Sequence, residues 1–280
     1  MRFALIFIII VGCTEPKEVL FKAGKPLGKV TKRLEEASGL TASINNPGYF
    51  WTINDSGNPA EVFLIDDHAK IKLVCKLTNA TNRDWEEIRI SHDKGKNYLY
   101  VGDIGDNKAE YNLKFIYRFE EPQLTNVNEM IIEDIDTLIL KMPDGRRDTE
   151  SIMIDPLTND LYILSKREDS IRLYLKQYPF LSDTLILDKM LTMPFHNIVS
   201  ADISPDGQEV LMKNYDKIFY WKKSGEESIS QLLEKEPIML PYKPEKQGEA
   251  ITWALDGAGF YTLSESPNDE WASLIFYKRK

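Results

Sequence analysis

The chain has few of the side chains on which most nucleophilic, redox and zinc sites depend. Its 280 residues include two cysteines and three histidines. Cys13 follows an apolar N-terminal run and Cys75 lies in an alternating strand-like segment, where we expect a small buried residue. The motifs Gly-x-Ser-x-Gly, His-Glu-x-x-His and Gly-x-x-x-x-Gly-Lys-Ser/Thr are absent. His68, His92 and His196 fall outside the repeat positions described below. These absences argue against histidine-based catalysis and leave carboxylate chemistry open.

The chain also lacks a surplus of positive charge. It has 35 lysines and arginines against 44 aspartates and glutamates, a formal net charge of −9. Nucleic-acid binding requires a basic face that displaces counterions from phosphates, so we expect no nucleic-acid partner. With 42% hydrophobic and 11% aromatic residues, the chain has enough apolar side chains for a sizeable core.

Only one long apolar run occurs, at residues 3–11 near the N-terminus. Nine residues are too few to span a bilayer core, which takes about 20. Arg2 precedes the run and Gly12-Cys13 follow it, a layout that resembles a bacterial lipoprotein signal. We therefore expect a signal peptide at residues 1–12, lipidation of Cys13, palmitate included, and a tether at 13–26 before a domain at 27–280. Thr14, where an inner-membrane retention signal would have Asp, favours the outer membrane of the bacterial envelope.

Past the tether, one plan recurs five times. Each unit has a polar residue two positions before an aliphatic anchor, then a turn and an apolar, often aromatic run. The anchors are Leu40, Ile88, Ile152, Ile203 and Ile251, at spacings of 48, 64, 51 and 48 residues. Propeller blades repeat every 40 to 50 residues or so, and turn formers stand between the first two strands of each unit. The sequence predicts an all-β propeller of four-stranded blades, five in number, or six if the 64-residue unit hides a degenerate blade.

Three details of this propeller can be predicted. Only 29 residues follow Ile251, too few for four strands, so we expect residues 28–34 to supply the missing strand and close the ring. The polar segment 120–128 accounts for the 64-residue spacing as an inserted loop before a strand near residues 131–140. Helical spacing is confined to residues 228–235.

The innermost strands of a propeller surround its axis, so equivalent residues of successive blades become neighbours. Two positions before the anchors stand Ser38, Glu86, Glu150, Ala201 and Glu249. The ends of the second strands bring further polar residues to the same face, namely Asn54, Asp103, Lys166, Arg167, Lys213 and Glu265. We expect these residues to form a ligand-binding mouth of the central channel, in which several glutamates repel one another unless a counter-charge is present.

Three arrangements would relieve this repulsion. Ca²⁺ could be held by oxygens of Glu86, Glu150, Glu249, Asn54 and Asp103. Alternatively, Lys166, Arg167 and Lys213 could neutralise the glutamates in an ion-pair network, or both signs could hold a charged organic ligand such as a small anion. The segments 55–58 and 103–107 have the composition of short metal-binding loops and equally of ordinary turns, and neither fits an EF-hand.

The segments Asp84-Trp85-Glu86-Glu87-Ile88, Tyr100 to Asn107, Asp148 to Ile152 and Gly248 to Ile251 resemble those of poorly characterised propeller proteins of bacterial envelopes. This resemblance spans nearly all of residues 28–280 and implies no particular activity. More distantly, the Glu-x-Ile starts are similar to blades of calcium-dependent lactonases and phosphotriesterases of the gluconolactonase type and of propeller phytases. That similarity implies a central Ca²⁺ with Glu150 or Glu249 as a ligand. The histidine pair of paraoxonase-like members and the carboxylate clusters of phytases have no counterpart here.

The function expected from the sequence is therefore that of a lipid-anchored envelope propeller that binds a ligand or an envelope protein at a carboxylate-lined mouth. The alternative is a Ca²⁺-dependent hydrolase of lactones or phosphoesters.

Overall fold

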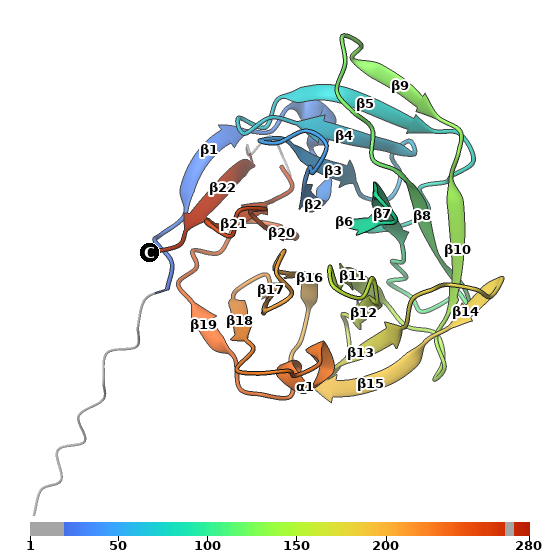
Figure 1. Ribbon diagram of the computed structural model, residues 1–280, viewed down its shortest axis with the longest axis vertical. Helices are drawn as coiled ribbons and strands as arrows, with labels where there is room; N and C mark the ends of the chain where they lie inside the picture. The colour runs from blue at the N-terminus through green and yellow to red at the C-terminus, as the bar shows by residue number, and fades with distance from the viewer. Residues whose placement is uncertain (1–19, 267–271) are drawn as a thin grey trace, which may run out of the picture.

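The computed structural model describes residues 20–266 and 272–280 and forms a five-bladed β-propeller (Figure 1). The predicted signal peptide, Cys13 and the first part of the tether lie outside the described residues.

From the axis outward, blade 1 contains β2 (Ala37–Ala42), β3 (Phe50–Asn54), β4 (Glu61–Ile65) and β5 (Ile71–Leu77), and blade 2 contains β6 (Trp85–Asp93), β7 (Lys96–Asp103), β8 (Lys114–Glu120) and β10 (Asp136–Lys141). Blade 3 contains β11 (Thr149–Ile154), β12 (Leu161–Ser165), β13 (Ile171–Lys176) and β15 (Asp188–Met193). Blade 4 contains β16 (Ile198–Ile203), β17 (Glu209–Asn214), β18 (Ile218–Lys222) and β19 (Ile238–Leu240), and blade 5 contains β20 (Ala250–Trp253), β21 (Gly259–Leu263), β22 (Ser273–Lys278) and β1 (Lys25–Lys29).

Two further strands cross to the outer edge of the preceding blade. β9 (Glu129–Ile132) follows β8 of blade 2 in the chain but pairs in parallel with β5 of blade 1. β14 (Thr184–Ile186) follows β13 of blade 3 and pairs in parallel with β10 of blade 2. The long spacing between the second and third anchors is thus an excursion across the edge of blade 1 and not a sixth blade. The strand predicted near residues 131–140 is divided between two sheets, and both crossings cover edges that would otherwise expose unpaired backbone groups.

The fourth strand of the last blade comes from the N-terminal side of the domain. β1 pairs antiparallel with β22, and it begins at Lys25, earlier than the predicted strand at 28–34. Residues 32–34 instead form the 3₁₀ turn η1 (Lys32–Leu34). The domain also begins earlier than predicted, because the Phe21 side chain is 2% exposed and its backbone forms an antiparallel β-bridge with that of Arg279. At Gly28 the strand approaches blade 1, since a Cβ there would lie 2.0 Å from the His68 carbonyl oxygen.

The hydrophobic core is divided into five clusters, one between each pair of neighbouring blades. Because each blade is covered on both faces, the innermost strands β2, β11 and β20 are buried along their whole length. Cys75 is a buried residue of β5, as predicted, and burial raises its pKa to about 12. The predicted helix is α1 (Ile229–Leu233), which begins at a capping box formed by Ser228 and Gln231. Across the described ranges, the structure contains no helix with the length and apolar character needed to cross a bilayer.

Candidate functional site

The glutamates predicted at equivalent positions lie where the innermost strands begin. In β6 and β11 the pairing register shifts so that Glu86 and Glu150 are each left without a cross-strand partner. Such a bulge turns its extra residue out of the regular pleat, and here it frees two glutamates from the inter-blade packing. Glu249 directly precedes β20 at the same end of the ring. Local irregularities in the backbone therefore direct the predicted carboxylates to one face.

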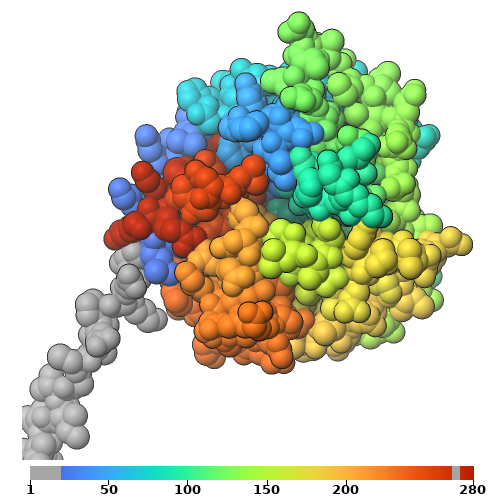
Figure 2. Space-filling model, in the orientation of Figure 1, coloured from blue at the N-terminus to red at the C-terminus, as the bar shows by residue number. Residues whose placement is uncertain are grey.

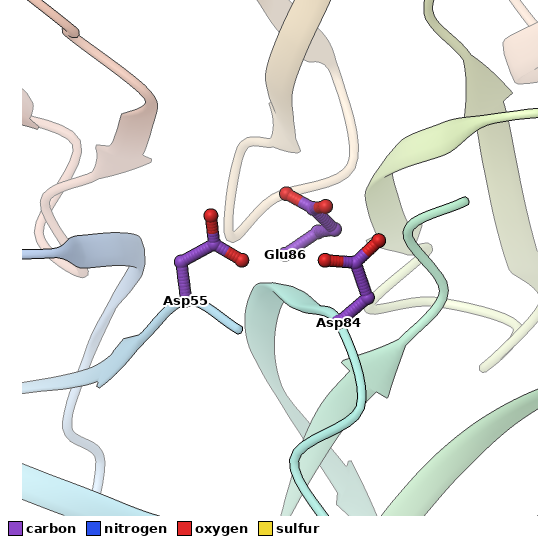
Figure 3. A group of neighbouring side chains, drawn as sticks. All are labelled: Asp55, Asp84 and Glu86. Carbon is purple, nitrogen blue, oxygen red and sulfur yellow. The ribbon is translucent and has the colours of Figure 1, made fainter. Parts of the chain in front are cut away.

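Three carboxylates gather most closely at this face. Asp55 follows β3 of blade 1, and Asp84 and Glu86 stand at the start of β6 in blade 2. Each offers a carboxylate oxygen that lies within 4.8 Å of the others, and Figure 3 shows the three side chains converging on one space. Within the described part of the chain, no lysine or arginine forms an ion pair with any of the three. We call Asp55, Asp84 and Glu86 the acidic triad.

A glycine allows these carboxylates to approach the backbone. A Cβ at Gly105 would lie 2.2 Å from Oε1 of Glu86 and 2.4 Å from Oδ2 of Asp84. Gly105 lies between β7 and β8, and its amide donates a 3.1 Å hydrogen bond to the Asp84 carbonyl. Any larger residue would displace the triad.

The surroundings of the triad disfavour the ionised form of its three carboxyl groups. Burial raises the pKa of Asp55 to about 7, and the negative charges of Asp84 and Glu249 add to this shift. The pKa of Glu86 is raised well above its ordinary value by burial, by the charges of Glu150 and Asp55, and by a hydrogen bond with Glu150. Burial and the charge of Asp148 raise the pKa of Asp84 as well. At neutral pH the triad therefore holds protons that a bound cation would displace.

One lysine stands beside the triad. Nζ of Lys166 lies 2.7 Å from Oε1 of Glu150 and 5.5 Å from the centre of the Tyr215 ring. Burial by itself lowers the Lys166 pKa, but the charges of Glu150 and Glu249 outweigh it and the pKa is raised. The pKa of Glu150 nevertheless rises to about 8, because desolvation by burial exceeds the effect of Lys166. Lys166 thus forms an ion pair with one carboxylate, and its charge also acts on Glu86.

Glu249 and Glu265 complete this part of the mouth. The Tyr215 hydroxyl donates a 2.5 Å hydrogen bond to Oε1 of Glu249. Burial raises the pKa of Glu265 to about 8, and the charge of Glu249 and a hydrogen bond with it contribute further. We define the acidic mouth as the triad together with Glu150, Lys166, Glu249 and Glu265.

The other predicted mouth residues make separate contacts. Arg167 pairs with Asp148 at 2.6 Å, and Asp103 lies 3.6 Å from Arg83 and accepts a hydrogen bond from the Asp84 amide. The Asn54 amide group donates to the Arg33 carbonyl. Lys213 is fully buried and donates to the carbonyls of Gly248 and Asn214, and burial lowers its pKa to about 8. The lysine–arginine network expected from the sequence is thus limited to individual pairs.

The two loops with metal-like composition differ in their structural roles. In the loop 103–107, both carboxylate oxygens of Asp106 accept backbone amides, those of Glu110 and Tyr111. Asp106 therefore stabilises a turn. In the loop 55–58, Asn58 donates to the Asp55 carbonyl and the Ser56 amide donates to the Asp55 carboxylate, which also lies beside Asp84 and Glu86 (Figure 3).

Sequence reasoning missed Arg89, which lies at the centre of the propeller. Its guanidinium is 2% exposed and donates to backbone carbonyls of the innermost strands of all five blades, those of Leu40, Ile88, Ile152, Ala201 and Ile251. Its Nη2 also lies 2.7 Å from Oε2 of Glu87, whose pKa burial raises to about 8. The signal available in the sequence was an arginine between two isoleucines, Ile88 and Ile90 of β6.

Arg89 has two consequences for the site. It closes the channel on the propeller axis, because its guanidinium bridges the innermost strands of all five blades. Its hydrogen bonds also identify the equivalent residues of the blades, and they place Ala201, not Ile203, at the fourth anchor position. The predicted register of blade 4 was wrong by two residues, and the residue in line with Glu86, Glu150 and Glu249 is Val199.

The triad suits a hard cation by its chemistry. Three carboxylates provide up to six oxygen donors, the donor type that Ca²⁺ prefers. No protein-family profile matches the chain, and no curated protein matches it.

Proposed function

We propose that the protein is a binding module whose acidic mouth takes up a divalent cation, Ca²⁺ being the best fit to an all-oxygen site. The observation that carries this proposal is the acidic triad, in which three carboxylates lie within 4.8 Å of one another and, among the described residues, none forms an ion pair with a lysine or arginine, although the charges of Lys114, Arg83 and Lys166 act on them from farther away. The excess of carboxylates over Lys166 favours a cation over a small anion.

In this proposal the chain's own residues have distinct tasks. Asp55, Asp84 and Glu86 would hold the cation, and Gly105 leaves room for their carboxylates. Lys166 keeps Glu150 paired beside the triad, and Tyr215 orients Glu249. Binding would release protons from the groups whose pKa is raised, so affinity should fall as the pH falls from 8 to 6.

The test is the thermal stability of the purified protein in EDTA and then in a series of CaCl₂ concentrations. A ligand that binds only the folded state stabilises it by about 2.7 kcal/mol at a hundredfold excess over Kd. We expect a Ca²⁺-dependent rise in Tm that is lost in Asp55→Asn and Glu86→Gln and kept in Glu226→Gln, an exposed glutamate far along the chain in blade 4. No rise in the parent protein, or an equal rise in all variants, would contradict the proposal.

We further propose that the propeller is anchored to the bacterial envelope, the outer membrane being favoured, and presents its mouth to a ligand or an envelope protein there. Support comes from the signal-like residues 1–12 and Cys13. Metabolic labelling with palmitate should mark the parent chain and not Cys13→Ala. Equal labelling of both would exclude acylation at Cys13 without affecting the proposal for the mouth.

A Ca²⁺-dependent hydrolase is the second candidate, and the acidic triad favours it. A cation held by these carboxylates would act as a Lewis acid on a carbonyl or phosphoryl oxygen of a substrate. A panel of lactones and phosphotriesters assayed with and without Ca²⁺ tests this candidate. Turnover that requires Ca²⁺ and is lost in Asp55→Asn would establish it, whereas Ca²⁺ binding without turnover leaves the binding module.

A further inference from the structure

A cavity lies on the propeller axis, at the opposite end of the innermost strands from the acidic mouth. It has a volume of about 230 Å³ and is lined by residues of all five blades, which include Thr41, Ile90, Ile154, Ile203 and Leu255. Figure 2 looks onto this face, where the first turns of the five blades, coloured from blue to red, surround a central hollow. Arg89 also lines this cavity, so its guanidinium separates the cavity from the mouth. We call this cavity the axial well.

The walls of the well are mostly apolar, and its charged lining residues are Arg89 and Asp202. Oδ2 of Asp202 accepts hydrogen bonds from the Thr252 hydroxyl at 3.0 Å and the Trp253 amide at 2.9 Å. Oδ1 lies 3.7 Å from Nε of Arg89, longer than a hydrogen bond. The well therefore combines apolar walls with one carboxylate oxygen that retains acceptor capacity.

These features define the ligand. Arg89 and Asp202 carry opposite charges 3.7 Å apart, so the well has no net charge to attract an ion and a neutral molecule fits best. The guanidinium is already saturated by carbonyls of all five blades, so of the two charged lining residues Asp202 is the one that can accept a hydrogen bond from a donor on the ligand. An engineered apolar cavity of about 150 Å³ holds benzene, so a well of about 230 Å³ has room for a fused pair of rings.

We propose that the axial well is a binding site for a small neutral aromatic molecule with one N–H or O–H donor, which it directs at Asp202. The site is independent of the cation proposed for the mouth. His92, which the sequence placed in a polar segment away from the channel, also lines this well.

The experiment is isothermal titration of the full-length chain carrying Cys13→Ala with indole, and then with the isomers 3-methylindole and 1-methylindole. The isomers have the same size, but only 3-methylindole keeps the N–H donor. We expect saturable binding of indole and 3-methylindole with Kd of about 0.1–1 mM, and binding of 1-methylindole weaker by about tenfold. Equal affinity for the two isomers would overturn the role of Asp202.

Two matched variants locate the site. Leu255 is 40% exposed and lines the well, whereas Leu157 is 62% exposed in the corresponding turn of blade 3 and does not line it. We expect Leu255→Trp to abolish indole binding and Leu157→Trp to preserve it, with the Tm of both variants close to that of the parent. No saturable binding to the parent chain, or binding that survives in Leu255→Trp, would refute the proposal.

Discussion

Neutralising a carboxylate of the acidic triad should stabilise the cation-free protein, because the three carboxylates repel one another in the folded chain. Two ionised carboxylates 4.8 Å apart repel each other by about 3 kcal/mol at an effective dielectric constant near 20. Glu86 has two such neighbours, and protonation relieves part of this energy at neutral pH. We therefore expect Glu86→Gln to raise the free energy of unfolding by about 1–3 kcal/mol at pH 8.5 in EDTA, or Tm by about 3–8 °C.

The pH dependence gives this prediction its sign. Carboxyl groups whose pKa is raised in the folded state contribute stability below their unfolded pKa, near 4, and lose it as the pH rises through the folded value. For Asp55 and Glu150 these folded values are about 7 and about 8. The stability of the parent protein should fall from pH 5 to pH 8.5, and the advantage of Glu86→Gln should grow over that interval.

Urea denaturation at pH 5, 7 and 8.5 in EDTA, with Glu226→Gln as the control for loss of one surface charge, measures both effects. If Glu86→Gln is less stable than the parent at pH 8.5, or if its advantage does not change with pH, the electrostatic account of the triad is wrong. Added Ca²⁺ should reverse the order, since the parent protein gains binding energy that the variant lacks.

Three further predictions follow from the same contacts. Arg89→Met should lower the free energy of unfolding by about 3–5 kcal/mol, because it leaves the Glu87 carboxylate buried without its partner. The double variant with Glu87→Gln should lose less stability than the sum of the two single variants, which a double-mutant cycle by denaturation measures. Gly28→Val should destabilise the protein by at least about 2 kcal/mol, because the valine side chain would clash with the backbone of the 66–70 turn. A thermal melt unchanged from that of the parent would contradict the prediction that β1 closes the ring. Lys166→Met should reduce stability relative to the parent chiefly above pH 8, where Glu150 of the parent ionises and pairs with Lys166. A pH-independent loss in the same melts would argue for a packing role instead.

Much of the fold could be predicted from the sequence because a propeller is a periodic object. The anchors recur at spacings of 48 to 64 residues, and turn formers mark the connection between the first two strands of each blade, so the propeller fold follows from local patterns. The structure then decides for five blades over six. The capping residues of α1 and the burial of Cys75 depend on similarly local signals. The same periodicity predicted that Glu86, Glu150 and Glu249 begin equivalent strands.

Other features depend on contacts between residues far apart in the chain. β9 follows a strand of blade 2 in the chain but pairs with blade 1, and β14 follows a strand of blade 3 but pairs with blade 2. An exposed sheet edge can accept any strand that reaches it. The register of blade 4 was misjudged since an alternating strand fits its neighbours equally well when shifted by two residues, and the Arg89 hydrogen bonds to Ala201 identify the actual alignment.

The sequence by itself thus determined the periodic architecture and the residue types at the mouth. Tertiary structure alone decided which carboxylates meet. Asp55 and Asp84 come from loops of two blades, and their distance depends on how those blades pack, on the backbone at Gly105 and on the central arginine that closes the channel. Such distances arise from the packing of whole sheets, which no local pattern of residues encodes.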